Sequence, residues 1–163
     1  MRPSLLLAPL LCVVLAATGC SEDELGEPPT RDERGVVTSS GELLPEQLQV
    51  GDCIGGDFSV SASIVNAIPC SESPTAQVVG VGDDPSLAVT PYPGPEGMST
   101  SALNICAPAF LNFIGLPYTT SLLEIVHLDP TQESWAEGDR TVVCFARNRS
   151  GKPLPGSVQN ANV

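Results

Sequence analysis

Apolar and polar residues alternate in several short stretches of the chain, which is the period-two pattern of half-buried β-strands. The longest alternation runs from Phe58 to Ile64, where a serine occupies every second position, and it predicts the clearest strand. Shorter strands are predicted at 48–50, 77–81, 87–90, 121–128 and 141–146. The run 91–95 contains three prolines and a glycine, and it predicts an exposed loop.

One stretch has helical rather than strand periodicity. Apolar residues recur at spacings of three and four between Leu103 and Ile114, so that one side of a helix would be apolar. Ser99 or Thr100 can cap its N-terminus. Pro108 lies inside the pattern and predicts a kink or a later start, because proline lacks the backbone N–H that an inner helical turn needs. Together the patterns predict an α+β fold, with one main helix on a small antiparallel sheet.

The N-terminus has the composition of an export signal. Arg2 precedes an apolar run that ends at Ala17, and small residues then lead directly to Cys20. Residues 17–20 resemble the bacterial lipobox, in which the cysteine thiol receives a diacylglycerol. We therefore expect residues 1–19 to be a lipoprotein signal peptide and Cys20 to carry the lipid. Ordinary signal cleavage at the same position is the alternative.

A polar, acidic stretch follows the predicted signal. Residues 20–46 contain the pair Pro28-Pro29 and several carboxylates, and they predict a disordered tether. We expect a folded domain over residues 47–150. An irregular C-terminal tail is expected over 151–163, where prolines and glycines are frequent.

The cysteines that remain after export form an even set. With Cys20 lipidated, the other four are Cys53, Cys70, Cys106 and Cys144. In an exported chain they predict two disulfides, for which three pairings exist. We favour Cys53 with Cys70, which would join neighbouring strands, and Cys106 with Cys144, which would attach the helix to the last strand. The rival is a structural zinc site, but no Cys-x-x-Cys spacing occurs, so no metal is expected.

Charge and composition restrict the function. Seven Lys and Arg against 19 Asp and Glu give a net charge of −12. This argues against nucleic acid as a partner, since phosphate binding needs clustered cations, and against electrostatic binding to an anionic membrane surface. One histidine, one lysine and the absence of a hydrolase or phosphate-binding motif leave little catalytic chemistry. We expect no enzymatic activity and no cofactor.

Three groups of residues, taken in chain order, carry a resemblance to a known family. They are Gly51-Asp52-Cys53, the segment 69–74 (Pro-Cys-Ser-Glu-Ser-Pro), and Trp135-Ala136-Glu137-Gly138-Asp139-Arg140 followed by Cys144. Over residues 48–158 the chain resembles the septum formation domain of exported and membrane proteins of actinobacteria. The resemblance implies an envelope protein linked to division and wall synthesis, with no established enzymatic activity. Family members usually carry Pro-His after the second cysteine, whereas Thr75 follows Pro74 here, so any role of that histidine is absent.

The motif residues also have structural interpretations. They are Gly51, Asp52, Trp135, Gly138, Asp139 and Arg140. The two glycines are expected at tight turns, which the two aspartates can cap with a carboxylate oxygen. The arginine can pair with a carboxylate or with backbone carbonyls, or stack on the tryptophan. The tryptophan itself is expected to close the edge of a small core.

These observations predict a non-catalytic, lipid-anchored module on the outer face of the cytoplasmic membrane. It would be linked to septum formation or wall synthesis through contacts with an envelope protein of unknown identity. The alternative is a lipoprotein that binds the cell wall or a small ligand at a concave site with Tyr92, Tyr118 and Trp135. A cavity beside these aromatic residues would favour the alternative, and a filled core would favour the interaction module.

Overall fold

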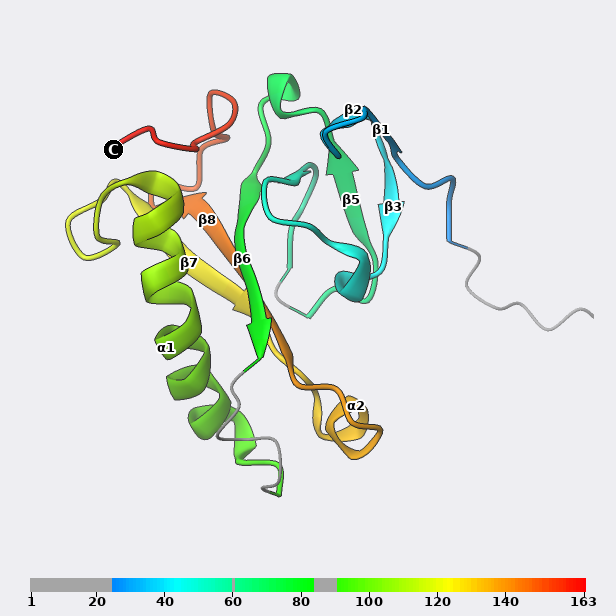
Figure 1. Ribbon diagram of the computed structural model, residues 1–163, viewed down its shortest axis with the longest axis vertical. Coiled ribbons are helices and arrows are strands. Elements are labelled where there is room, and N and C mark those ends of the chain that lie inside the picture. The colour runs from blue at the N-terminus through cyan, green and yellow to red at the C-terminus, as the bar shows by residue number, and fades with distance from the viewer. Residues whose placement is uncertain (1–24, 60, 84–90) are drawn as a thin grey trace, which may run out of the picture.

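The computed structural model describes residues 25–59, 61–83 and 91–163, which contain a six-stranded antiparallel sheet of order β3-β5-β4-β6-β8-β7 (Figure 1). Its strands are β3 (Gly41–Leu43), β4 (Cys53–Ile54), β5 (Val65–Ile68), β6 (Ala76–Asp83), β7 (Leu123–Leu128) and β8 (Thr141–Asn148). Strands β1 (Thr30–Arg31) and β2 (Val37–Ser39) pair separately. The helices are α1 (Gly94–Ile114) and α2 (Gln132–Ala136), and the 3-10 turns are η1 (Pro45–Gln47) and η2 (Cys70–Glu72). The predicted α+β class, with one main helix on an antiparallel sheet, is confirmed.

Strand β8 shows that both faces of the sheet are buried. Its residues Val142, Cys144 and Ala146 belong to the apolar cluster that α1 covers, whereas Val143 and Phe145 belong to the cluster on the other face. Successive side chains of a strand point to opposite faces. A strand covered on both faces therefore needs a continuous apolar run, which β8 has.

Helix α1 lies along β6 and β8 and is longer than its sequence pattern predicts. It begins at Gly94, before the predicted caps at Ser99 and Thr100, so the predicted loop 91–95 was wrong at its end. Pro95 fits the first helical turn, where its missing N–H has no helical partner to lose. The helix also continues through Pro108, which therefore does not mark a later start.

Two disulfides connect these elements in the predicted pairing. Cys53 of β4 is bonded to Cys70 of η2, and Cys106 of α1 is bonded to Cys144 of β8. Their Cα atoms are 5.2 Å and 5.3 Å apart, within the ordinary range for a disulfide. The second disulfide attaches α1 to the sheet.

Two predicted strands are wrong. In the segment 58–64, the Ser61 N–H donates a hydrogen bond to Ser59 Oγ (3.4 Å), and the Ala62 N–H donates to the Ser59 carbonyl (3.1 Å). Serine hydroxyls that bond the nearby backbone compete with a strand ladder, and β5 starts only at Val65. The strand predicted at 48–50 is instead an irregular segment that follows η1, with Leu48 as the C-cap of η1 and Val50 in a turn. The strands predicted at 77–81, 121–128 and 141–146 are found as β6, β7 and β8, and the one at 87–90 lies outside the described residues.

The prediction of a disordered tether over residues 20–46 was wrong for its described part. From Thr30 to Leu43 the chain forms β1, β2 and β3, and Val37 and Leu43 are buried. These few apolar side chains suffice because their packing partners come from the rest of the domain, which the local composition does not reveal. The folded domain therefore begins before residue 47. The signal and Cys20 lie outside the described residues.

The C-terminal tail is irregular, as predicted, but it is firmly attached. Leu154 and Val158 are buried against the cluster that α1 covers. The Leu154 N–H donates to the Pro74 carbonyl (2.7 Å), and the Asn160 N–H donates to the Phe113 carbonyl (2.8 Å). The tail therefore closes one end of the core.

Candidate functional site

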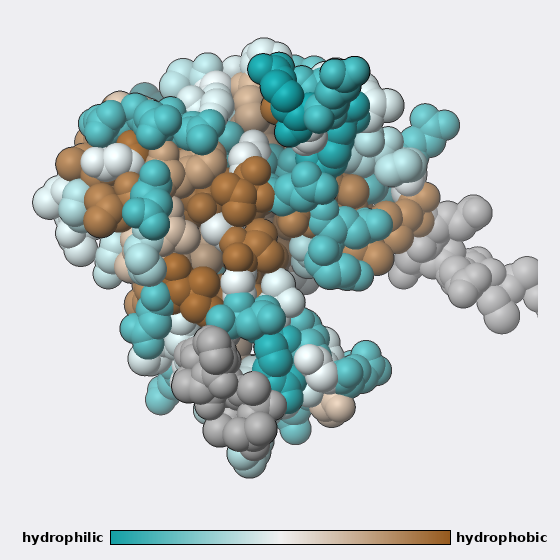
Figure 2. Space-filling view, in the orientation of Figure 1, coloured by the Kyte–Doolittle hydropathy of each residue, from teal (hydrophilic) through white to brown (hydrophobic). Residues whose placement is uncertain are grey.

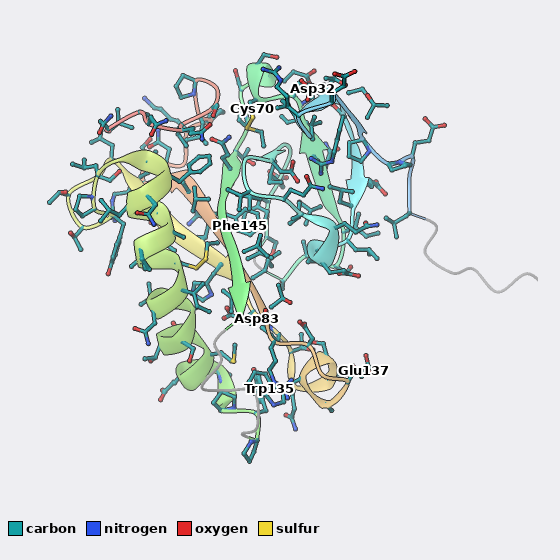
Figure 3. The ribbon with its side chains drawn as sticks, viewed as in Figure 1. Asp32, Cys70, Asp83, Trp135, Glu137 and Phe145 are labelled. Carbon is teal, nitrogen blue, oxygen red and sulfur yellow. A yellow bond between two sulfur atoms is a disulfide. The ribbon has the colours of Figure 1, made fainter. Side chains whose placement is uncertain are left out.

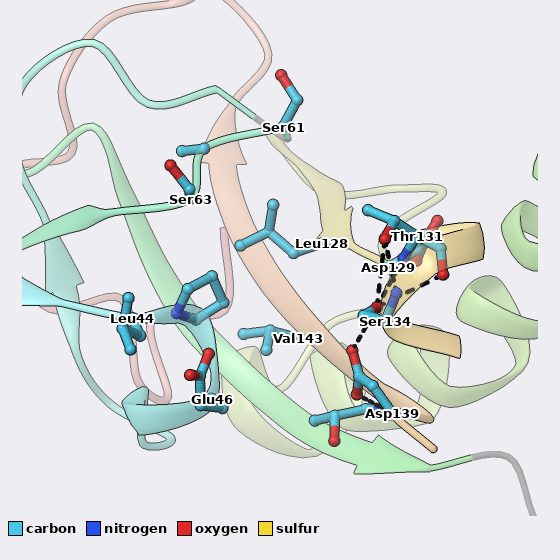
Figure 4. A pocket seen from close by; sticks show the side chains of 13 residues that line it. Leu44, Glu46, Ser61, Ser63, Leu128, Asp129, Thr131, Ser134, Asp139 and Val143 are labelled. Atoms are coloured by element: carbon cyan, nitrogen blue, oxygen red, sulfur yellow. Dashed lines mark hydrogen bonds between the residues drawn. The ribbon is translucent and has the colours of Figure 1, made fainter. Parts of the chain in front are cut away.

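A groove of about 430 Å³ crosses the surface where three distant segments of the chain meet (Figure 4). One wall of the groove comes from η1 and the residue before it. The opposite wall comes from α2 and the neighbouring ends of β7 and β8. The loop residues 61–63 form a third border. The lining residues are Leu44, Pro45, Glu46, Ser61, Ala62, Ser63, Leu128, Asp129, Thr131, Ser134, Asp139, Thr141 and Val143. The size falls within the range of about 300–1,000 Å³ that is typical of ligand clefts.

The groove has an apolar floor and acidic walls. Leu128 and Val143 lie between the two walls in Figure 4, and both are buried. Glu46 stands on the η1 wall, and Asp129 and Asp139 stand on the α2 wall. Among the described residues, no Lys or Arg lines the groove. Its electrostatic character is therefore negative.

The tryptophan-to-arginine motif builds the α2 wall. The Arg140 guanidinium lies over the Trp135 ring, with Cζ 3.7 Å from the ring centroid. Arg140 Nη1 also donates to the carbonyls of Trp135 (2.8 Å) and Asp139 (2.6 Å). The predicted stacking is thus present, together with carbonyl hydrogen bonds that tie the end of α2 to the start of β8. Gly138 has a φ of 102°, a conformation that glycine adopts without a steric penalty.

Asp139 connects this turn to the groove. Its Oδ1 accepts from the Thr141 N–H (2.9 Å), and its Oδ2 accepts from the Ser134 hydroxyl (3.0 Å). Ser134 in turn exchanges hydrogen bonds with Thr131, which caps α2. The predicted turn cap is therefore also a lining residue of the groove, and its carboxylate has a fixed position.

The Gly51–Asp52 motif is hydrogen-bonded to the segment that follows η1, and η1 forms the opposite wall of the groove. Asp52 is buried and accepts two hydrogen bonds from the Arg31 guanidinium, at 2.5 Å and 2.9 Å. Asp52 Oδ2 also accepts from the Gln49 N–H (2.8 Å), just after η1. The hydrogen bond with Asp52 raises the pKa of Arg31 further above its ordinary value, so this arginine stays charged. Gly51 precedes the aspartate with a φ of 102°.

Sequence reasoning missed one buried polar residue that links the motifs to the tail. Gln77 of β6 is 1% exposed, and its Nε2 donates to the Gly51 carbonyl (2.9 Å) and to Ser157 Oγ (3.0 Å). Its Oε1 accepts from the Val158 N–H (2.7 Å). The only signal in the sequence is its position in the stretch 76–82, whose other residues are apolar.

The aromatic residues of the alternative prediction pack into the structure. Tyr92 and Trp135 stack edge to face with ring centroids 5.8 Å apart, while Tyr118 contacts Phe110 in the same manner at 6.4 Å. In the part of the chain that the structure describes, none of the three cavities of about 430, 190 and 370 Å³ is lined by Tyr92, Tyr118 or Trp135.

Further side-chain clusters were considered as sites. Of the described groups of His, Cys, Asp and Glu, none gathers three side chains that could hold a metal ion. His127 Nδ1 lies 2.7 Å from Asp129 Oδ1, but His127 itself does not line the groove. Within the described residues no helix is long and apolar enough to span a membrane.

Charge is unevenly distributed over the surface. Helix α1 contains no Asp, Glu, Lys or Arg after Glu96, and its Leu103 and Leu111 are 38% and 43% exposed. Figure 2 shows apolar surface over α1, while hydrophilic surface dominates around the N-terminal strands. The side chains labelled in Figure 3 place Trp135 and Glu137 at α2, at the opposite end of the sheet from Cys70.

The fold and the groove together define a small, disulfide-braced α+β domain with an acid-lined surface groove. The chain belongs to the Septum formation family, whose model matches residues 40–144. All four disulfide cysteines and every lining residue of the groove fall within this range. The membership links the chain to septum formation. No curated protein and no solved structure matches the chain.

Proposed function

We propose that this protein is a non-catalytic, lipid-anchored module of the cell envelope that acts in septum formation by binding another envelope protein. The family membership of residues 40–144 is the observation that carries the proposal. The predicted export signal and the lipobox-like residues before Cys20 support attachment to the outer face of the cytoplasmic membrane. The two disulfides are consistent with an oxidising location of this kind.

The chemistry of the groove supports binding rather than catalysis. On the α2 wall, the Thr131 and Ser134 hydroxyls and the Asp139 carboxylate are engaged in helix capping and turn formation, as the Ser134–Thr131 and Asp139–Thr141 hydrogen bonds show. An activated nucleophile needs a general base within hydrogen-bond distance and a group that orients that base. Since His127 lies outside the lining, the described groove residues do not supply that arrangement. An apolar floor beneath charged walls is instead a common composition for a docking surface.

Membrane attachment is tested by changing Cys20→Ser. We expect the variant to leave the membrane fraction, because the lipid supplies the anchor in this proposal. Cell fractionation with immunoblotting measures the change, and Cys12→Ser, within the predicted signal, is the matched control that should leave the distribution as it is. A Cys20→Ser protein that stays in the membrane fraction would contradict the lipid anchor.

The role in septation is tested by imaging. A fluorescent fusion of the full chain should concentrate at division sites through the cell cycle, and a deletion strain should misplace or delay its septa. A uniform envelope distribution together with normal septa in the deletion strain would contradict the proposed function.

A further inference from the structure

Among the described residues no Lys or Arg forms an ion pair with a carboxylate of the groove, although Asp129 Oδ1 lies 2.7 Å from the His127 imidazole. Glu46 is exposed on one wall, while Asp129 and Asp139 are half-buried on the other. The arginines that form ion pairs do so elsewhere, at Asp52, Asp32 and Glu124. In a chain of net charge −12, such a groove repels anions and attracts cationic groups.

The floor requires more than a cation. The apolar surface that is open to solvent in the groove comes mainly from Leu44, Pro45 and Ala62, which are half-buried, because Leu128 and Val143 are only 7% and 2% exposed. A small polyamine would satisfy the carboxylates but would leave this apolar surface in contact with water. An occupant that also covers the floor with aliphatic side chains gains the hydrophobic contribution in addition to the charge attraction.

The rim can hydrogen-bond a polypeptide backbone. Ser61 and Ser63 place hydroxyl groups along the groove, and each hydroxyl can donate or accept a hydrogen bond. In an extended peptide, successive side chains point to opposite sides. Aliphatic side chains at every second position can therefore face the floor. Long Lys or Arg side chains at the intervening positions can bend back to the carboxylates of the rim.

We propose that the groove binds an extended segment of a partner protein in which Lys or Arg alternates with small aliphatic residues. This inference rests on the proposed function as a protein-binding module, and it assigns the site and the chemistry of the partner. It also gives the two sequence motifs a shared role. The Asp52 motif positions the wall that carries Glu46, and the Trp135–Arg140 motif positions the wall that carries Asp139.

A random decapeptide display library, screened against the full-length chain in non-ionic detergent, tests the specificity. We expect the selected peptides to carry Lys or Arg alternating with Val, Ala or Leu. The most enriched peptide is then labelled, and its affinity is measured by fluorescence anisotropy. Glu46→Lys should weaken binding by about tenfold, because it removes an attraction and adds a repulsion at the rim.

Glu72→Lys is the matched control, because Glu72 is exposed on η2, lies outside the groove lining and undergoes the same change in charge. It should change the affinity by less than about twofold, since an exposed charge outside the contact is screened by salt. Thermal unfolding of both variants checks that each is folded. The inference is overturned if the library yields no enriched peptide, if it yields acidic or uncharged peptides, or if the two variants weaken binding equally.

The same variants separate this inference from the proposed function. In cells, Glu46→Lys should lose its concentration at division sites while Glu72→Lys keeps it. If both variants still concentrate there, septation is supported and the groove is rejected as the docking site. If peptide binding depends on Glu46 but the wild-type protein is uniformly distributed, the groove is supported and the septation role fails.

Discussion

Asp52 illustrates how much of this fold depends on single buried polar residues. Its carboxylate is almost fully removed from solvent, and it gathers Arg31 from the N-terminal strands and Gln49 from the end of η1. A buried charge of this kind is stable only when it is paired and hydrogen-bonded. The N-terminal segment that appears featureless in sequence therefore completes the environment of a motif residue.

Removing the arginine should expose this dependence. Arg31→Met leaves the buried Asp52 carboxylate without its cation, and we expect a loss of about 2–4 kcal/mol in the free energy of unfolding. Arg34→Met is the matched control, because the Arg34 side chain is 82% exposed in its pair with Asp32. Exposed pairs contribute little, so the control should lose less than about 1 kcal/mol. Urea unfolding followed by circular dichroism measures both, and equal losses would contradict the assignment.

Gln77 is a second such residue. Gln77→Leu leaves the Gly51 carbonyl and the Val158 N–H without their partner, and we expect destabilisation by about 2–3 kcal/mol because unsatisfied buried groups are costly. The exposed Gln159 provides the control, and Gln159→Leu should change stability by less than about 0.5 kcal/mol. Amide hydrogen exchange should additionally show faster exchange at Val158 in the Gln77 variant. Unchanged exchange there would rule out the proposed link to the tail.

At the scale of elements, α1 packs against one face of the sheet and covers the apolar cluster on that face. Cys106 of α1 is bonded to Cys144 of β8 across 38 residues, and Cys53 to Cys70 across 17. By chain entropy, loops of these sizes contribute about 3–4 kcal/mol each to stability. The helix also approaches β6 closely, because Gly80 has no side chain at the point of contact with Ala109.

Adding a methyl group at Gly80 should separate the helix from the sheet. A Cβ there would lie 2.6 Å from Ala109 Cβ, so Gly80→Ala is expected to destabilise the protein by about 1–3 kcal/mol. Two residues along the same strand, a Cβ on Gly82 would meet Ile105 Cγ2 at 3.4 Å, which is close to ordinary contact. Gly82→Ala should therefore be tolerated much better. Differential scanning calorimetry of the two variants checks the order, and a reversed order would contradict the packing described for α1.

The whole molecule has a large excess of negative charge. With a net charge of −12, the folded chain repels itself, and salt screens this repulsion. The acid-lined groove concentrates part of this charge at one place. A cationic occupant of the groove is therefore attracted by the net charge of the whole protein as well as by the carboxylates of the groove.

Salt should consequently stabilise the isolated protein. Raising sodium chloride from about 0.01 M to 0.15 M shortens the screening length from about 30 Å to 8 Å, and we expect Tm to rise by a few degrees. Glu72→Lys lowers the net charge from −12 to −10 and should reduce this rise. Thermal unfolding at several salt concentrations measures the effect. A Tm that stays constant or falls with added salt would show that self-repulsion is not a significant part of the stability.

The local sequence pattern was sufficient to predict the elements whose apolar periodicity follows directly from their burial. The apolar run of β8 and the three-and-four spacing of α1 identified both elements, because burial on a sheet or along one helix side imposes that period. The two disulfides followed from the even number of cysteines and from the predicted elements that carry them. Stacking on Trp135 and hydrogen bonds to backbone carbonyls were two of the interactions expected for Arg140, and both are present.

Tertiary structure decided the features that join distant segments. The described residues of the alternation at 58–64 do not form a strand, because serine side chains there hydrogen-bond the nearby backbone in place of a strand ladder. The acidic stretch after residue 24 folds, because Arg31 finds a buried carboxylate that lies 21 positions further along the chain. The groove is lined by residues that lie between 44 and 143 in the sequence, so no local hydrophobic periodicity could predict it. Hydrophobic period is a short-range property of a chain, whereas ion pairs and cavities arise only when remote segments come together.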